Sequence, residues 1–597
     1  MSIPRPWWEG LGEGVNCYTK RLITEVSEKS KKMDYFIKTI VSLLREKTNL
    51  QEDEIRKLIE IPPDFKMGDY AFPCHSLAKT LKNSPNNIAT ELSKVLRTTD
   101  SIIEIKAIGP YVNFFVNKTI FTEMVLKKIN EEQNCYGSGN IGSGKTVVFD
   151  YSSPNIAKHL AVHHLRSALI GNAIQNIYKT LGYKCIGINH LGDWGTQFGQ
   201  LIVAYKKWGT ENIHTSYTVT DLNNLYVKFH QETEKNPTLE DEAREWFKKL
   251  EAGDSGAKEL WQRFKDISLK EFQKIYDMLG IHFDAFIGES FYNTMVEDTV
   301  TRIKEKGLTR ISEQALIVDL ELYNMPPCLL RKKDDATLYA TRDIAAAEYR
   351  KKTYNFAKMI YVVGSEQKLH FKQVFKVLEL MGYDWANHCV HVDFGLMKFK
   401  DGKMSTRKGK VILLEDLLIE AVERIKKIIE EKNPALENKE VVANDVGIGA
   451  VIFADLSAKR NKDVVFDWDE ALNFEGETGP YVQYTHARLC SILRKYGRHV
   501  TADIHFELLN EDEAIILIKN LWRFPSIILK AAELYEPSLI SNYLIDVCSN
   551  LNRFYNAHRV LSDGEELTRA RILLVDATRQ VIKNGLHVLG IHAPEQM

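Results

Sequence analysis

Hydrophobic positions change their spacing along the chain, and the changes predict different kinds of structure. In residues 33–59 apolar side chains recur at helical spacing, and residues 102–117 form a β-rich run with a Gly-Pro turn in its middle. From residue 145, two short apolar runs (TVVFDY and YKCIGIN) flank a helical stretch at 165–181. Strand, loop, helix and strand in this order predict a doubly wound α/β fold with a parallel sheet. From about residue 470 onward the spacing is almost wholly helical.

These patterns divide the chain into regions with different expected structures. The first residues are turn-rich and precede a second methionine, Met33. They are either an upstream extension, with the start residue uncertain, or an interaction tail. The α/β region contains a charged helical stretch, which we interpret as an insertion. The expected regions are an atypical N-terminal extension (1–32), an α+β N-terminal domain (33–120), the α/β domain (121–469) with its insertion (about 206–275), and an all-α C-terminal domain (470–597).

Composition and charge narrow the class of protein. The chain has 597 residues, of which 44% are hydrophobic and 27% charged, which is typical of globular proteins. No apolar run is long enough for a transmembrane helix, so no membrane association is expected. Basic and acidic residues balance at 79 and 80, which excludes a uniformly basic nucleic-acid binder but allows a locally basic surface. The eight cysteines are scattered without CxxC spacing, which predicts no structural zinc and suits a reducing cytoplasm.

Residues 139–146 match the P-loop pattern GxxxxGK[ST] letter for letter. A P-loop needs a strand before it and a helix after it, because the helix N-terminus helps to bind phosphate. Here a helical pattern precedes the glycines and the strand TVVFDY follows them. We therefore interpret the segment as a turn between domains. The alternative is a P-loop NTPase, in which Lys145 would be essential.

Two other segments are better candidates for phosphate chemistry. The loop 152–164 leads from a strand end into a helix start, where open α/β sheets bind nucleotides, and it contains Lys158, His163 and His164. The alternative is that these residues only cap the helix or lie on the surface. The second segment, 401–411, holds four basic residues between glycines and could stabilise developing negative charge. Its alternative is a solvated run of charges.

Six blocks follow one another along the chain: SSPNIAKHLAVHHLRS, NHLGDWGTQFG, LYATRDIAAA, YVVGSEQKLHF, KMSTRKG and FEGETGPYVQYTHAR. In this order they resemble the arginyl-tRNA synthetases, a family of class I aminoacyl-tRNA synthetases, in their bacterial form. The resemblance covers Met33 to Met597. It implies a Rossmann-type catalytic domain at 121–469, an N-terminal domain at 33–120 that binds the tRNA elbow, and a helical anticodon-binding domain at 470–597. Composition does not indicate an anticodon-binding domain, because the residues from Tyr481 to Met597 include 13 basic and 13 acidic side chains and so have no excess of positive charge.

The two class I signatures carry over unequally. The KMSKS-type loop is present at 403–407, with arginine at its last position. The HIGH signature aligns with 161–164, where only the final histidine is kept and His163 replaces the glycine that lets the backbone approach adenine. Lys158 matches a family lysine that compensates for the altered KMSKS loop. The resemblance implies a catalytic set of Lys158, His164, Lys403, Ser405 and Arg407, and an ATP-binding set of Ala161, His163, His164, Lys403, Met404 and Lys408.

The resemblance also implies an arginine pocket. A guanidinium is best bound by planar, bidentate acceptors such as carboxylates. Asp343 matches the family carboxylate that recognises arginine, and Tyr339 lies four residues earlier, on the same face if the segment is helical. The alternative for Asp343 taken alone is a surface carboxylate paired with a nearby cation, but its place in the block LYATRDIAAA favours the pocket. The implied arginine-binding set is Asp150, Asn155, Tyr339, Asp343 and Gln367.

The resemblance thus implies an arginine–tRNA ligase that uses ATP and Mg²⁺ to join L-arginine to tRNA(Arg), in the cytoplasm and as a monomer. The alternative is a synthetase-derived paralogue that binds arginine or tRNA with impaired catalysis. The altered HIGH signature motivates this alternative.

Overall fold

The computed structural model describes residues 35–62, 65–210, 217–333, 339–400, 412–562 and 564–597. The chain separates into two compact units, which we describe in turn. The first unit comprises Met1–Gly137, Ile492–Leu529 and Asp546–Val581, and the second comprises Ser138–Ser491, Lys530–Ile545 and Ile582–Met597.

The first unit contains an antiparallel sheet in the order β1-β3-β2. Helix α2 packs a stripe of fully buried side chains, Phe36, Ile40 and Leu44, as the helical spacing of its apolar residues predicts. The Trp522 ring of α20 lies 6.2 Å from the ring of Tyr70 in β1, so α20 packs against the sheet. The elements are α2 (Tyr35–Arg45), α3 (Glu52–Leu58), β1 (Tyr70–Pro73), α4 (His75–Leu81), α5 (Pro85–Val95), β2 (Ile102–Ile108), β3 (Tyr111–Val116), α6 (Lys118–Glu132) and α20 (Asp512–Trp522).

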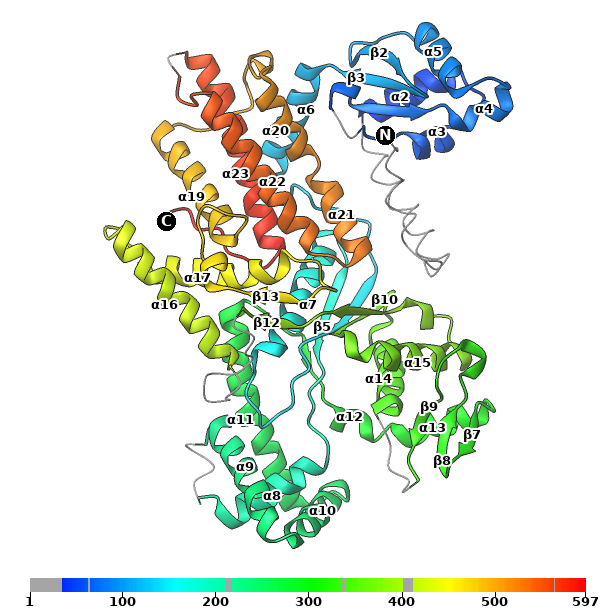
Figure 1. Cartoon of the computed structure of the whole chain (residues 1–597), viewed down its shortest axis with the longest axis vertical. Helices are drawn as coiled ribbons and strands as arrows, with labels where there is room; N and C mark the ends of the chain where they lie inside the picture. Colours follow the sequence, from blue (N-terminus) through cyan, green and yellow to red (C-terminus); the bar gives the residue numbers. More distant parts are fainter. Residues whose placement is uncertain (1–34, 63–64, 211–216, 334–338, 401–411, 563) are drawn as a thin grey trace. The chain divides into compact units, whose positions relative to one another are not determined.

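The second unit is built on a five-stranded parallel sheet in the order β11-β10-β4-β5-β6 (Figure 1). The first strand in sequence, β4, has its later neighbours on opposite sides, which makes it the point where the strand order reverses. This confirms the predicted doubly wound α/β fold. The strands are β4 (Thr146–Asp150), β5 (Lys184–Asn189), β6 (Ala285–Phe286), β10 (Lys358–Gly364) and β11 (Cys389–Phe394), and α7 (Val162–Thr180) connects β4 to β5.

Helices fill the predicted insertion between β5 and β6. Figure 1 shows α8, α9 and α10 gathered in one lobe, and α11 leads back to the sheet. The run ALIVDL, which the sequence shows as strand-like, forms β8 in a separate antiparallel sheet with the order β7-β8-β9. The elements are α8 (Thr196–Trp208), α9 (Val219–Lys235), α10 (Thr238–Glu251), α11 (Ser255–Leu279), α12 (Glu289–Asn293), α13 (Val296–Glu305), β7 (Thr309–Ser312), β8 (Ala315–Val318) and β9 (Cys328–Arg331).

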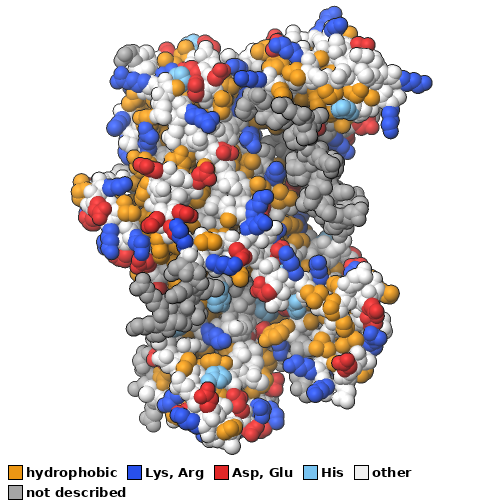
Figure 2. Space-filling view, in the orientation of Figure 1, with side chains coloured by type: hydrophobic (Ala, Val, Ile, Leu, Met, Phe, Trp, Pro, Cys, Tyr) orange, Lys and Arg blue, Asp and Glu red, His pale blue; other side chains and the backbone are white. Residues whose placement is uncertain are grey.

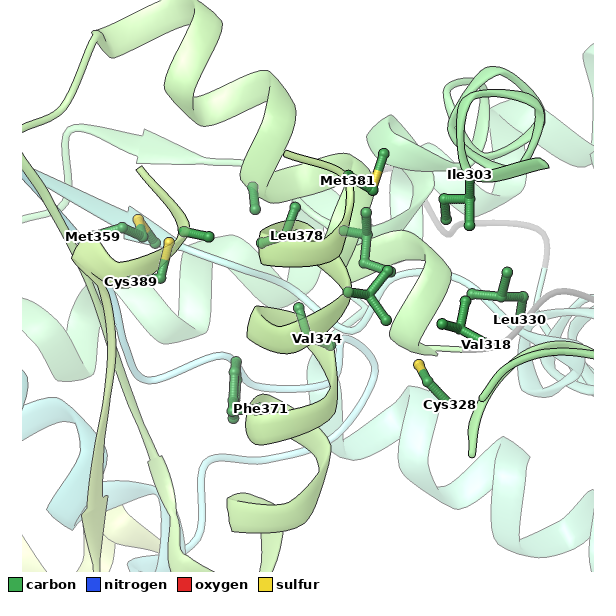
Figure 3. Packing of buried hydrophobic residues seen from close by; sticks show 14 of the residues in the cluster. Ile303, Val318, Cys328, Leu330, Met359, Phe371, Val374, Leu378, Met381 and Cys389 are labelled. Carbon is green, nitrogen blue, oxygen red and sulfur yellow. The ribbon is translucent and has the colours of Figure 1, made fainter. Parts of the chain in front are cut away.

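A buried cluster fixes the two helices that follow this second sheet, α14 (Tyr339–Tyr354) and α15 (Lys368–Leu380). Figure 3 shows Phe371, Val374 and Leu378 along α15, between Met359 and Cys389 of the parallel sheet and Val318 and Leu330 of the antiparallel sheet. Ile344 and Ala347 of α14 belong to the same cluster. Because such a close-packed core resists movement, both helices hold their polar residues in fixed places.

The rest of the chain is mostly helical, which confirms the helical region predicted from about residue 470 onward. The helices α16 and α17 form a hairpin. The strand β12 precedes them in the sequence, β13 follows them, and the two strands pair in parallel. The helices α19, α21, α22 and α23 contribute residues to both units. The elements are β12 (Met397–Phe399), α16 (Leu414–Lys432), α17 (Lys439–Leu456), β13 (Val464–Phe466), α18 (Trp468–Ala471), α19 (Gly479–Tyr496), α21 (Phe524–Leu534), α22 (Ser538–Ala557) and α23 (Glu565–Val588).

The P-loop-like segment is a turn, as predicted. Gly139 and Gly142 donate backbone hydrogen bonds to Thr180 and Leu181 at the C-terminus of α7. Strand β4 follows the segment directly, so its amides do not begin a helix. The segment therefore lies at the amino end of β4, at the opposite edge of the sheet from the loop 152–161.

The surface agrees with the balanced composition. Figure 2 shows basic and acidic side chains interspersed over the visible face, in line with a net charge of −1. Within the parts of the chain that the structure describes, no helix is long and apolar enough to cross a membrane.

Candidate active site

The loop after β4 has an unusual backbone. Ser152, Ser153 and Ala157 all adopt positive φ, between 50° and 73°. Such conformations strain residues other than glycine and persist only where the surroundings hold them. They cluster at functional sites, and this loop follows the central strand at the point where the strand order reverses.

Helix α11 of the insertion holds this loop. Ser268 Oγ accepts a hydrogen bond from the Ala157 backbone N–H at 2.8 Å, and Tyr276 Oη lies 2.7 Å from Ser152 Oγ. His159 donates through Nδ1 to Glu271 at 2.7 Å. This hydrogen bond raises the pKa of His159. The insertion is therefore part of the scaffold of the site.

The first turn of α7 presents His164 as a hydrogen-bond donor. Its Nδ1 accepts a hydrogen bond from the Ala161 backbone N–H at 3.0 Å, so the neutral ring carries its proton on Nε2. Burial lowers the pKa of His164 to about 4, which keeps the ring neutral near pH 7. His163 is exposed, and its ring lies 4.0 Å from the ring of His164. Lys158 is also exposed, with its Nζ 5.6 Å from the centre of the Tyr226 ring.

The backbone joins the HIGH-like segment to the exit of the KMSKS-type segment. Ala161 forms an isolated β-bridge with Leu413, and the Leu414 N–H donates to Leu160 O at 2.8 Å. The predicted residues Lys403, Met404, Ser405, Arg407 and Lys408 lie outside the described residues. In the sequence, Leu413 comes two residues after the end of that segment, so the HIGH-like residues pair with the part of the chain that follows it.

Two of the predicted arginine ligands share one face of α14. Tyr339 and Asp343 are one helical turn apart, and Tyr339 is 64% exposed whereas Asp343 is half-buried. Asp343 accepts a hydrogen bond from His370 Nε2 of α15 at 2.5 Å. Gln367 is exposed at the start of α15, three residues before His370. The two helices therefore bring Asp343 and Gln367 to the same side of the sheet.

The other two predicted arginine ligands lie at the end of β4 and in the loop that follows it. Asp150, the last residue of β4, is buried, and Arg350 Nη1 donates to its Oδ2 at 2.7 Å. Asn155 is exposed and bridges to Gly192 after β5. A Cβ on residue 192 would lie 1.8 Å from Asn155 Oδ1, so any other residue there would displace the Asn155 side chain from its present position. The structure thus gives Asp150 an internal partner and leaves Asn155 accessible.

Further acidic residues lie close to this pocket. Burial raises the pKa of Glu289 to about 7, and Arg342 contacts its carboxylate at 3.2 Å. The negative charges of Asp343 and Asp193 raise the pKa of Glu289 further. Asp193 is fully buried and paired with Lys265 at 2.7 Å. Within the described parts of the chain, no group of three or more His, Cys, Asp or Glu side chains could hold a metal ion.

Sequence reasoning missed four residues that contact the predicted ligands or lie beside them. One signal was present for Arg350, because it lies seven residues after Asp343 and so on the same face of α14. His190 directly follows β5, which places it at the carboxyl edge of the sheet. His370 and Glu289 depend on how separate elements pack, and no local pattern marks them. The missed residues are His190, Glu289, Arg350 and His370.

Comparison with known families agrees with this arrangement. Residues 126–468 match the class I (R) tRNA synthetase catalytic domain. Residues 482–597 match the DALR anticodon-binding domain. Residues 22–116 match the arginyl-tRNA synthetase N-terminal domain. The matches follow the order that the sequence blocks imply.

The chain is similar to whole arginine–tRNA ligases of bacteria. It is 53% identical to the enzyme of Clostridium beijerinckii over 566 residues, covering 95% of this chain and 100% of the relative. It is 51% identical to that of Halothermothrix orenii over 563 residues, covering 94% of this chain and 100% of the relative.

Solved structures give the same result. The arginyl-tRNA synthetase of Thermus thermophilus matches with a TM-score of 0.76 at 26% identity, covering 90% of this chain and 96% of that one. The enzyme of Plasmodium falciparum matches with a TM-score of 0.79 at 26% identity, covering 95% and 100%. The predicted resemblance is thereby confirmed, and the chain belongs to the arginyl-tRNA synthetases, a family of class I aminoacyl-tRNA synthetases.

Proposed function

We propose that the chain activates L-arginine with ATP at the carboxyl edge of the parallel sheet and transfers it to tRNA(Arg). The observation that carries the proposal is the backbone bridge between Ala161 and Leu413, because it holds the HIGH-like segment against the residues that follow the KMSKS-type segment in the sequence. The whole-length similarity to arginine–tRNA ligases favours this function over a binding paralogue with impaired catalysis.

In the first step the carboxylate of arginine attacks the α-phosphate of ATP. Arginyl-adenylate forms, and pyrophosphate leaves. No side-chain nucleophile is needed, so the protein contributes by positioning the reactants and stabilising charge. The Nε2–H of His164 and the ammonium of Lys158 would bind phosphate oxygens, together with Lys403, Ser405 and Arg407. Ala161, His163, Met404 and Lys408 would complete the nucleotide site.

Asp343 would bind the guanidinium of arginine, with Tyr339 beside it. One oxygen of Asp343 accepts from His370, which orients the carboxylate and leaves the other oxygen for the substrate. Asn155 and Gln367, both exposed, would contact the α-amino acid end. Asp150 would add negative charge below the ligand.

Mg²⁺ binds oxygen ligands and keeps part of its water shell, so it would enter on the phosphates of ATP rather than in a cage of side chains. It would neutralise phosphate charge when bound. The exposed Lys158 lies on the same loop and would supply the protein's own positive charge there.

In the second step the terminal ribose hydroxyl of the tRNA takes the arginyl group. Residues 470–597 would bind the anticodon and residues 33–120 the elbow of the tRNA. These boundaries, the monomeric state and the cytoplasmic location stay predictions, and gel filtration with light scattering tests the monomer.

Charging of tRNA(Arg) with labelled L-arginine and ATP tests the proposal directly. We expect the full chain to charge tRNA(Arg) with arginine and not with lysine. If the chain binds arginine and tRNA but forms no arginyl-tRNA, the proposal is contradicted, and the alternative of a binding paralogue with impaired catalysis is supported. Lys158→Ala should lower the charging rate while leaving arginine binding intact.

A further inference from the structure

The face of α14 that carries Tyr339 and Asp343 ends in a guanidinium that the steps above do not use. Arg350 is 1% exposed and touches residues at the ends of two strands. Its Nη1 donates to Asp150 at 2.7 Å, after β4, and its Nη2 lies 3.0 Å from Nδ1 of His190, after β5. Its Nε donates to Tyr292 Oη at 3.3 Å. Arg350 thus links residues at the carboxyl ends of β4 and β5, beside the predicted arginine ligands.

These contacts determine the protonation of His190. A guanidinium has only donors, so Nδ1 of His190 must accept the hydrogen bond from Arg350. The ring is therefore neutral and carries its proton on Nε2. Its orientation is fixed as well, because it stacks on the Tyr292 ring at 5.5 Å with an interplanar angle of 7°. Burial also lowers the pKa of His190, which disfavours the charged ring.

The Nε2–H of His190 has no hydrogen-bond partner among the described residues, and the side chain is partly exposed. His190 lies close enough to Asp150 and Asp343 for their charges to act on it. A free donor thus lies beside the predicted arginine ligands. Free L-arginine carries its hydrogen-bond acceptors only on its carboxylate, since its ammonium and guanidinium groups only donate.

We propose that Arg350 is a positioning residue that holds His190 as the Nε2–H tautomer, and that His190 donates this hydrogen bond to the carboxylate of L-arginine. The inference rests on the proposed function, because it needs L-arginine to be the ligand of this pocket. The donor would orient the group that attacks ATP, while the opposite end of the substrate is bound by Asp343.

Two substitutions of His190 separate this role from a structural one. In His190→Asn the amide oxygen replaces Nδ1 as the acceptor for Arg350, but no donor remains at the position of Nε2. In His190→Gln the amide nitrogen replaces the Nε2–H donor, and the acceptor for Arg350 is lost. Each variant is tested by calorimetry with two ligands, L-arginine and agmatine. Agmatine is arginine without its carboxylate, so it lacks the group that His190 would bind.

We expect His190→Asn to weaken L-arginine binding by about 10- to 100-fold, as expected for a lost hydrogen bond to a charged group, and to leave agmatine binding nearly unchanged. His190→Gln should keep more of the preference for L-arginine than His190→Asn does. Arg350→Lys retains the positive charge but not the forked guanidinium that contacts both Asp150 and His190. It should therefore also reduce the preference for L-arginine over agmatine. The exposed His282 gives the matched control, because His282→Asn should change neither affinity.

Equal weakening of both ligands in His190→Asn, or no weakening, would overturn the inference. So would a larger loss of preference in His190→Gln than in His190→Asn. Thermal unfolding of each variant shows whether the fold is kept. Failure of the proposed function looks different, because the unmodified chain would then neither bind L-arginine nor charge tRNA(Arg).

Discussion

At the scale of single residues, the HIGH-like segment keeps one residue of the family pattern and alters another. Nδ1 of His164 accepts a hydrogen bond from the backbone of Ala161, which leaves Nε2 for the phosphate contact proposed above. His163, in contrast, adds a ring where the family pattern has glycine and where adenine should approach the backbone. The ring lies against His164 on the exposed side of the helix start.

Removal of this ring gives the first prediction. His163→Gly should lower the KM for ATP several-fold, because the backbone can then approach the adenine ring. It should also cost about 1 kcal/mol of stability, since glycine is unfavourable in a helix. Steady-state charging at varied ATP concentration measures the first effect, and thermal unfolding the second. A raised KM for ATP would show instead that the His163 ring contributes to nucleotide binding.

The second prediction concerns Asp343, the carboxylate proposed to bind the guanidinium. Asp343→Ala should weaken L-arginine binding by roughly 10- to 100-fold, the usual effect of removing a charged hydrogen-bond partner. Calorimetry with L-arginine measures it. Asp319 forms an ion pair with Arg310 beyond this pocket, so Asp319→Ala is the control and should bind arginine normally. Unchanged affinity in Asp343→Ala would remove Asp343 from the pocket.

At the scale of elements, the strained loop 152–161 depends on α11. The pKa of His159 is raised by its hydrogen bond to Glu271, so the folded state binds this proton more tightly than the unfolded state. The resulting stabilisation is fully present below the ordinary histidine pKa and is lost as the pH rises through the raised value. Comparison with His159→Gln isolates this contribution.

This linkage gives the third prediction. The melting temperature of the unmodified chain should exceed that of His159→Gln more at pH 6 than at pH 9, and the difference should correspond to about 1 kcal/mol or less. Differential scanning fluorimetry at both pH values measures it. His282→Gln, at an exposed position, should show no such pH dependence. A difference that is the same at both pH values would exclude the ion pair as its cause.

The P-loop-like segment gives the fourth prediction. Lys145 is exposed at the amino end of β4, whereas the candidate active site follows the carboxyl end of the same strand. Lys145→Ala should therefore leave kcat/KM for ATP unchanged in the charging assay, and Lys158→Ala is the contrasting variant. Loss of activity in Lys145→Ala would support the P-loop alternative.

The elements also show what sequence alone could predict. Buried strands and amphipathic helices have local patterns, so the doubly wound sheet and the helical insertion were predictable. ALIVDL was predictable as a strand, but its place in the antiparallel sheet was not, because pairing depends on residues far apart in sequence. Likewise Asp343 was found from its block, whereas its partner His370 comes from the next helix. The internal partner of Asp150, Arg350, is 200 residues away.

At the scale of the whole molecule, tRNA binding does not follow from composition. The C-terminal region has equal numbers of basic and acidic residues, and Figure 2 shows both signs interspersed. Recognition would then depend on local arrangement rather than on a uniform positive field. The salt dependence of charging should accordingly be weaker than for a uniformly basic protein.

The first residues of the chain give the last prediction. Arginine–tRNA ligases match this chain over their whole length while covering 95% of it, and the N-terminal family model begins at residue 22, so the first residues of the chain lie outside that model. A shortened chain that begins at Met33 should therefore charge tRNA(Arg) within about twofold of the full chain, as is usual for a dispensable terminus. Parallel assays at limiting tRNA measure the effect, because a binding tail would act mainly on the KM for tRNA. A large rise in that KM would show that residues 1–32 contact tRNA and are an interaction tail rather than an upstream extension.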